Sequence, residues 1–260
     1  MTRGHDPKNE LPPLAFARWP QVDRSDRRLL IVPVGSLEQH GPHLPLDTDS
    51  RIATAVAGAV HARLPQVGLA PCIPIGASGE HAGFPGTLSI GTDALALLVT
   101  ELVRHASLFW EHVLIINGHG GNTEALRSAQ KTCQHERRSL TLHHIRWQNG
   151  DAHAGISETS LMLHLAPELV RMDLAEIGNN EPLHRLVPML VDEGVRAVSH
   201  NGVLGDPRRA NATAGAELFS QVSQAAIKRA RLQLTGLRPS PTSRVVVTSG
   251  VGAPVGQDDP

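Results

Sequence analysis

Four short apolar runs, each followed by a stretch with helical spacing, constrain the fold of this 260-residue chain. The first of them, residues 29–34, is rich in branched residues, which is typical of a strand buried on both faces. Strands that alternate with helices predict a parallel sheet covered on both sides. We therefore expect an α/β fold, a three-layer αβα sandwich with a mostly parallel central sheet. The predicted strands are residues 29–34, 68–75, 113–116 and 140–145.

Helical spacing and capping residues predict the segments between these strands. The expected caps are Asp49 or Ser50, Thr92 or Asp93, and Asn122. Residues 170–200 show no clear pattern and are expected to be irregular. We expect a flexible arm at residues 1–13, a single domain at 14–237 and a disordered tail at 238–260, because both ends of the chain are polar and contain proline. The predicted helices run from the caps to about residues 64, 109 and 133, from about 158 to 167, and from 212 to about 234.

The composition excludes several classes of partner. Lysine and arginine number 24 against 25 acidic residues, so the net charge of -1 offers no field for nucleic acid or a charged membrane. Aromatic residues make up 3% and there is no tyrosine, which argues against stacking on single-stranded nucleic acid. No apolar run approaches the roughly 18 residues of a membrane span, and the N-terminal residues lack a signal-peptide pattern. We expect a cytoplasmic protein whose partner is a small molecule or a peptide.

Polar clusters follow three of the predicted strands. Glu38, His40 and Asp49 come after the first strand, His119 after the third, and His153 with Glu158 after the fourth. Ligands of open α/β sheets bind outside the carboxyl ends of the strands, so these clusters can converge on one cleft.

Carboxylates and imidazoles are ligands of zinc, iron and manganese. Glu38 and His40 are two residues apart and point the same way in extended backbone. Asp49 has two oxygens and could bridge two ions about 3.5–4 Å apart. The structural alternative is that Asp49 caps a helix and His40 bonds a backbone carbonyl. For residues 117–122, Asn-Gly-His-Gly-Gly-Asn, the structural alternative is a glycine-rich turn between a strand and a helix. A phosphate loop is rejected, because the motif lacks its lysine and its glycine spacing.

Four separated motifs resemble the creatininase (creatinine amidohydrolase) family over about residues 25–235. They are Glu-Gln-His-Gly-Pro-His-Leu-Pro-Leu-Asp-Thr-Asp at 38–49, Phe-Pro-Gly-Thr at 84–87, the 117–122 motif, and His-Ala-Gly-Ile-Ser-Glu-Thr-Ser at 153–160. The resemblance implies a creatininase-like α/β amidohydrolase with two divalent ions per subunit (zinc, iron or manganese). It also implies a homo-oligomer, a hexamer or an octamer.

The resemblance also implies roles for single residues. Glu38, Asp49 and His119 correspond to ligands of one ion, and His40 and Asp49 to ligands of the other, with Asp49 as the bridge. Creatininase has a glutamate two residues after the third-strand histidine, where this chain has Gly121. We expect Glu158 to replace it, although Glu158 could merely favour a helix N-terminus. His153 corresponds to the histidine that transfers protons; alternatively, it only supports a metal ligand. Glu80, His81 and Trp147 are expected to line the substrate site.

The substrate is less constrained than the reaction. The Gly-Gly loop and Gly-Asp-Pro-Arg-Arg-Ala at 205–210 resemble members that act on a modified precursor peptide. Another small amide, a formylaminopyrimidine, is the alternative. Creatinine is disfavoured, because Asn149 stands where creatininase has a lid tryptophan. Two readings from other classes are a non-enzymatic metal-binding protein and a nucleotide-binding protein, and the acids after the first strand disfavour the second.

Overall fold

The computed structural model describes residues 10–147 and 151–236, and a four-stranded parallel sheet forms the centre of this part of the chain. The strand order is β2-β1-β3-β4. β1 pairs with β3 from Leu29 opposite His112 to Val34 opposite Asn117. The predicted α/β fold with a parallel sheet is therefore confirmed. The strands are β1 (Leu29–Val34), β2 (Gly68–Leu69), β3 (His112–Asn117) and β4 (Leu140–His144).

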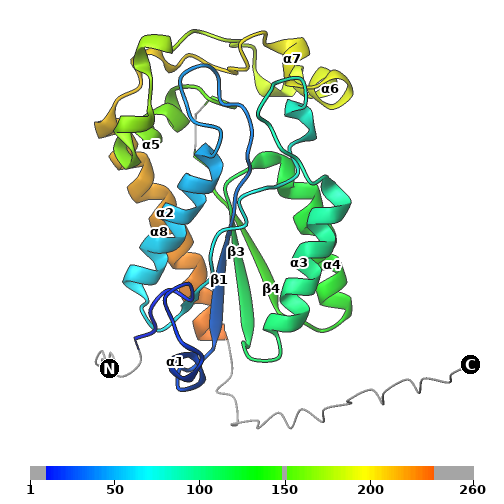
Figure 1. Cartoon of the computed structure of the whole chain (residues 1–260), viewed down its shortest axis with the longest axis vertical. Helices are drawn as coiled ribbons and strands as arrows, with labels where there is room; N and C mark the ends of the chain where they lie inside the picture. Colours follow the sequence, from blue (N-terminus) through cyan, green and yellow to red (C-terminus); the bar gives the residue numbers. More distant parts are fainter. Residues whose placement is uncertain (1–9, 148–150, 237–260) are drawn as a thin grey trace, which may run out of the picture.

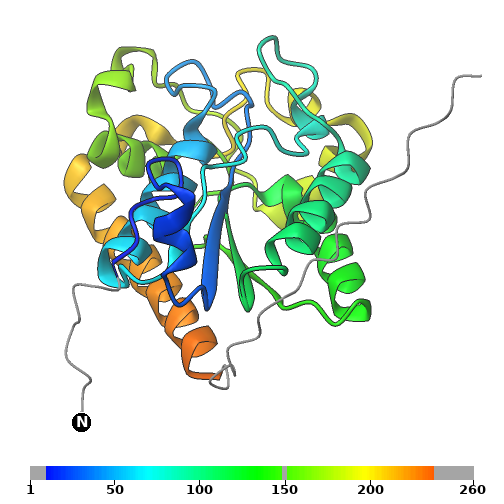
Figure 2. The same cartoon turned by 60° about the horizontal axis from the view of Figure 1, so that its bottom comes forward.

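Helices cover both faces of this sheet, as Figures 1 and 2 show. Alternate residues of β1 and β3 point to opposite sides, so each strand contributes to two hydrophobic clusters. α3 and α4 pack on one face, and α2 and α8 pack on the other. The helices are α1 (Trp19–Asp23), α2 (Thr48–Arg63), α3 (Thr92–Ala106), α4 (Thr123–His135), α5 (Ile156–Leu165), α6 (Leu183–Glu193), α7 (Val195–Val198) and α8 (Ala212–Gly236).

Two predicted segments differ from the structure. The second strand ends at Leu69, because Pro71 and Pro74 have no N–H for a regular ladder, and only an isolated bridge joins Ile73 to Val34. The prediction that residues 170–200 are irregular was wrong, since this segment contains α6 and α7. These two helices lie at the end of the molecule where the polar loops gather (Figure 1).

The predicted caps are also corrected. α2 begins at Thr48 after Asp47, so the expected caps Asp49 and Ser50 lie inside its first turn. Gly91 precedes α3 in place of the expected Thr92 or Asp93. Asn122 does precede α4, but its side chain bonds other segments: its Oδ1 accepts from Ala77 N–H (2.8 Å) and its Nδ2 donates to Gly35 O (2.9 Å).

The ends of the chain are described only in part. Of the predicted arm, residues 1–9 lie outside the described residues, whereas Leu11 is buried and its N–H donates to Pro65 O at 2.9 Å. The predicted tail at 238–260 also lies outside them, as does Asn149. Among the helices of the described part, none combines the length and apolar character that a membrane span requires.

Candidate metal centre

The polar loops converge at the carboxyl edge of the sheet. Glu38 and His40 follow β1, and Asp49 lies in the first turn of α2. His119 follows β3, and Glu158 lies in the first turn of α5. All of these side chains are buried, and the structure brings together the residues that the sequence predicted as ligands.

Asp49 stands between two imidazoles. Its Oδ1 lies 3.3 Å from His40 Nε2, and its Oδ2 lies 3.2 Å from His119 Nδ1. Each oxygen therefore faces a different nitrogen. This is the arrangement that a carboxylate bridging two ions requires.

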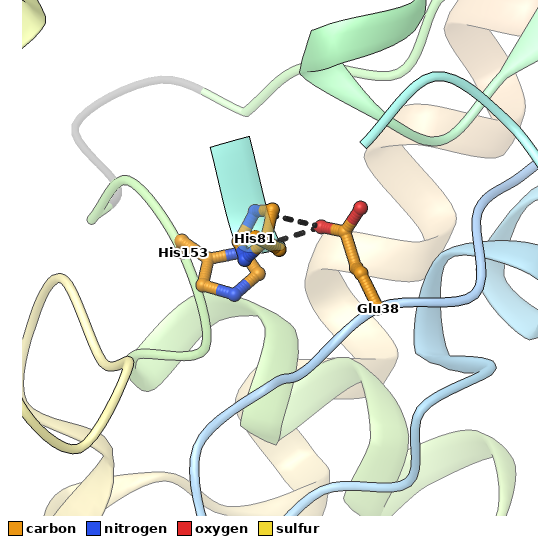
Figure 3. A group of neighbouring side chains, drawn as sticks. All are labelled: Glu38, His81 and His153. Atoms are coloured by element: carbon orange, nitrogen blue, oxygen red, sulfur yellow. Dashed lines mark ion pairs between the residues drawn. The ribbon is translucent and has the colours of Figure 1, made fainter. Parts of the chain in front are cut away.

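Glu38 lies on the His119 side of Asp49. Its Oε2 is 3.1 Å from His119 Nδ1 and accepts a hydrogen bond from Ser36 Oγ at 2.6 Å. Its Oε1 faces two more imidazoles, with His81 Nε2 at 3.2 Å and His153 Nδ1 at 3.8 Å (Figure 3). Glu38 thus connects the predicted ligand His119 with His81 and His153.

Glu158 lies on the other side, next to His40. Its Oε2 is 3.8 Å from His40 Nε2 and 4.0 Å from His153 Nδ1. The same oxygen accepts a hydrogen bond from Ala154 N–H at 2.6 Å, close to the start of α5. Glu158 therefore supports the helix start and also faces the cluster, so the two readings of the sequence are compatible.

Backbone carbonyls fix which ring nitrogen of three histidines faces the cluster. His40 Nδ1–H donates to Glu38 O at 3.1 Å, and His119 Nε2–H lies 3.2 Å from Ala77 O. His153 Nε2–H donates to Gln39 O at 2.8 Å. The opposite nitrogen of each ring is then the one that faces the carboxylates and could offer its lone pair to a metal, which is how metal-binding histidines are usually held.

Unpartnered buried atoms indicate that this cluster suits a cation. Glu38 Oε1, His40 Nε2 and Asp49 Oδ2 have no hydrogen bond of acceptable geometry within the described part of the chain. Buried polar atoms without partners are rare and need a reason. Three overlapping groups have ligand atoms close enough together to hold an ion, and the donor set of carboxylates and imidazoles fits zinc, iron or manganese. The groups are Glu38/His40/Asp49, His40/His153/Glu158 and Glu38/His81/His153.

Protonation in this cluster follows from burial and charge. Burial opposes the charge on Asp49, but His40 and His119 outweigh it and hold the pKa of Asp49 well below its usual range. Burial alone would lower the pKa of His40, whereas Asp49 and Glu158 raise it to about 10. Burial, with the charge of Asp49 nearby, raises the pKa of Glu158 to about 7. In the metal-free protein, protons bound at His40 and Glu158 therefore offset the negative charge of the cluster.

A cavity of about 840 Å³ opens from the cluster to the surface. Asp49, His119, His153 and Glu158 line one part of it, together with the predicted Glu80 and His81. α6 forms an opposite, apolar wall, which the sequence prediction missed because it assigned no helix there. Its apolar side chains at the cavity are those of Leu183, Val187, Leu190 and Val191, and Asp192 and Glu193 at the end of α6 line the cavity as well. Trp147 does not line this cavity, because it packs against two hydrophobic clusters of the core.

Comparison with known proteins agrees with this geometry. The family model described as "Creatininase: Creatinine amidohydrolase" matches residues 15–230. The "Mycofactocin precursor peptide peptidase" of Mycobacterium ulcerans (strain Agy99) is 47% identical over 81% of this chain and 84% of that protein. The protein of the same name from Mycolicibacterium smegmatis is 48% identical over 75% and 81%.

More distant relatives have other names. A creatinine amidohydrolase of Pseudomonas putida is 29% identical over 56% of this chain and 67% of its own length. A formylaminopyrimidine deformylase of Methanobrevibacter ruminantium is 26% identical over 68% and 79%. The solved structure "Creatininase Mn" superimposes with a TM-score of 0.73 at 23% identity, over 85% of this chain and 97% of that one. This structural likeness shows the shared fold.

Proposed function

The chain belongs to the creatininase family, and on that premise we propose that it hydrolyses an amide bond with two divalent ions held around Asp49. The observation that carries this proposal is the position of Asp49, whose two oxygens face different imidazoles. Zinc, iron and manganese all accept this donor set. Glu38, Asp49 and His119 would hold one ion, and His40, Asp49 and Glu158 the other.

Such ions would supply a water whose pKa falls from about 15.7 towards about 7, and a polarised amide carbonyl. His153 presents its bare Nδ1 to the cluster and accepts a proton from the attacking water. The water oxygen bonds to the carbonyl carbon, and the C–N bond breaks. The proton then passes from His153 to the departing nitrogen, so the products are a carboxylic acid and an amine.

We further propose that the substrate is the mycofactocin precursor peptide, from which the enzyme releases the modified, Val-Tyr-derived C-terminal dipeptide. The support is the identity of 46–48% to relatives of that name, well above the 26–29% to the creatinine amidohydrolase and the deformylase. The cavity of about 840 Å³, with its apolar α6 wall, suits a peptide end with apolar side chains. A homo-oligomer of six or eight subunits remains a prediction that light scattering can test.

A substrate panel tests this function. Purified protein loaded with zinc, iron or manganese is incubated with the modified precursor peptide, a formylaminopyrimidine or creatinine, and products are identified by mass spectrometry. We expect hydrolysis of the peptide only. Formate release from the pyrimidine would instead support the deformylase alternative, and full activity after complete metal removal would contradict the two-metal chemistry.

Substitution of Glu158 tests the second ion. Glu158→Gln removes the charge but keeps the shape, so we expect elemental analysis to find one ion per chain where the unchanged protein has two. Glu124→Gln is the matched control, because Glu124 lines the same cavity outside the cluster and should leave both ions bound. Two ions in Glu158→Gln would mean that Glu158 acts only as a helix-terminal residue.

Substitution of His153 tests the proton transfer. His153→Ala should keep both ions and lose turnover.

A further inference from the structure

Gln39 lies between two histidines of the site and was not singled out by the sequence. Its side chain is buried, with Nε2 at 2.9 Å from His81 Nδ1 and at 3.0 Å from His153 Nε2. The two imidazole rings are 4.6 Å apart between centroids, and both face Glu38 (Figure 3). One amide therefore contacts two rings that meet the same carboxylate.

The orientation of the Gln39 amide is fixed by backbone groups. Gly41 N–H donates to Gln39 Oε1 at 2.8 Å, so this atom is the acceptor. Gln39 Nε2 donates one hydrogen to Gly202 O at 3.0 Å. Gly202 has a φ of +80°, and a Cβ there would clash with Gln39 Oε1, so the site is shaped to receive this side chain. One amide hydrogen remains for the histidines.

That hydrogen goes to His81. His153 Nε2 lies 2.8 Å from Gln39 O, a carbonyl oxygen that can only accept, so His153 Nε2 carries a hydrogen itself. It cannot also accept from the Gln39 amide. His81 Nδ1 is then the acceptor, which requires it to be bare and leaves the ring hydrogen of His81 on Nε2.

His153 and His81 therefore differ in the ring nitrogen that faces the cluster: one lacks a hydrogen and the other carries one. His153 presents a bare Nδ1, 3.8 Å from Glu38 Oε1, whereas His81 presents an N–H at Nε2, 3.2 Å from the same oxygen. We propose that Gln39 is a positioning residue that sets which ring nitrogen of His81 and of His153 faces the cluster with a hydrogen and which without. We propose further that His81 is a hydrogen-bond donor to the substrate's amide oxygen and not a metal ligand. This inference rests on the proposed amide hydrolysis. His81 lines the cavity, and a fixed donor beside an oxygen that gains negative charge stabilises the transition state.

The competing arrangement is His81 as a third ligand beside Glu38 and His153. Distances alone allow it, because the three ligand atoms lie close together. A ligand needs a bare Nε2, however, which would move the hydrogen to Nδ1 and point it at the Gln39 amide hydrogens. Hydrogen bonding at Gln39 therefore decides between two roles that distance cannot separate.

Metal content separates donor from ligand without any substrate. His81→Ala should retain both ions in elemental analysis, whereas His119→Ala, the matched change of a proposed ligand, should lose one. Loss of an ion from His81→Ala would overturn the proposal. Long-range ¹H–¹⁵N NMR spectra of histidine-labelled, metal-free protein should show the His81 hydrogen on Nε2. In Gln39→Glu, whose carboxylate accepts and cannot donate, His81 Nδ1 should carry a hydrogen, and a bare Nδ1 in that variant would also overturn the proposal.

Turnover tests the donor role. His81→Ala should lower kcat about 10²–10³-fold with KM changed less than about threefold, as for a lost oxyanion donor. Glutamine can place an amide N–H near the former Nε2, so His81→Gln should recover at least about tenfold of that loss. No recovery would refute the donor role. If the unchanged protein cleaves no amide in the panel while the metal and NMR results hold, the proposed function fails and the sorting of the two rings stands.

Discussion

Gly121 shows, at the scale of one residue, why this position cannot carry an acidic side chain without disturbing the site. A Cβ at this position would clash with Glu80 Oε1 and His119 Nε2, and would lie 2.6 Å from Ala77 O. The space is occupied by Glu80, whose Oε1 is 3.2 Å from His119 Nε2. A glutamate here would displace the groups that hold His119. The absence of a side chain at position 121 is therefore consistent with the proposal that Glu158 supplies the acid.

Gly121→Ala should therefore disturb His119 and weaken binding of the ion that His119 would hold. We expect a loss of about 10–100-fold in metal affinity, the usual effect of disturbing the support of a ligand. Gly120→Ala is the control, because a Cβ there has no neighbouring atom within 4 Å. Competition with a chelator of known affinity measures both variants. Equal affinities in the two variants would show that the crowding at Gly121 has no effect on the site.

Protons compete with the proposed metals at His40. Its pKa, raised to about 10 mainly by Asp49 against the effect of burial, means that metal-free protein holds a proton there at pH 7. Binding of the ion proposed at His40 must release this proton, so affinity for that ion should rise about tenfold per pH unit from pH 7 to 9. Below pH 7 the slope should steepen, because Glu158, with a pKa of about 7, takes up a second proton.

Chelator competition at several pH values measures this slope. Glu158→Gln is expected to keep only the ion proposed at Glu38, Asp49 and His119, so the extra steepness below pH 7 should be absent from its metal affinity. A pH-independent affinity in the unchanged protein would mean that His40 does not bind metal.

At the scale of elements, the sequence predicted those that are well buried and missed α1, α6 and α7, which bury one residue each at most. β1 has the predicted bounds and β3 extends one residue beyond them at each end, because their apolar residues are buried on both faces. β4 ends one residue earlier than predicted, and Leu140 is its buried residue. α6 also has apolar residues at helical spacing, but Pro188 interrupts the pattern and Leu186 is its buried residue. Its other apolar side chains face the cavity or solvent, so no core requirement marked the helix in the sequence.

The exposed apolar wall of α6 predicts an effect on substrate binding. Val187→Asp places a charge against the proposed apolar part of the substrate and should raise KM about tenfold or more, with kcat nearly unchanged. Met189→Asp is a matched control on the same helix: Met189 is 46% exposed and Val187 44%, but Met189 does not line the cavity. Steady-state kinetics with the modified peptide measures both, and equal KM values would contradict a binding role for the wall.

At the scale of the whole molecule, parallel topology explains why distant residues of the site could be predicted together. The ends of β1 and β3, and the segment after β4, lie at one edge, so Glu38, His119 and Glu158 meet although about 120 residues separate the first from the last. The hydrogen bonds of Gln39 could not be predicted in this way. Gln39 meets His81 and Gly202 at separations of 42 and 163 residues, through loops that have no periodic pattern.

The same convergence predicts that metal stabilises the whole fold. Glu38, Asp49 and Glu158 are buried acids from separate segments, and unfolding disperses them. An ion that binds the native site alone, at 100 times its Kd, stabilises it by about 2.7 kcal/mol. For a chain of this size that corresponds to about 5–10 °C in Tm, which chelation should remove and added zinc restore in calorimetry. Asp49→Ala removes the bridge, so its Tm should not respond to the chelator; an equal response in this variant would place the stabilising ion elsewhere in the molecule.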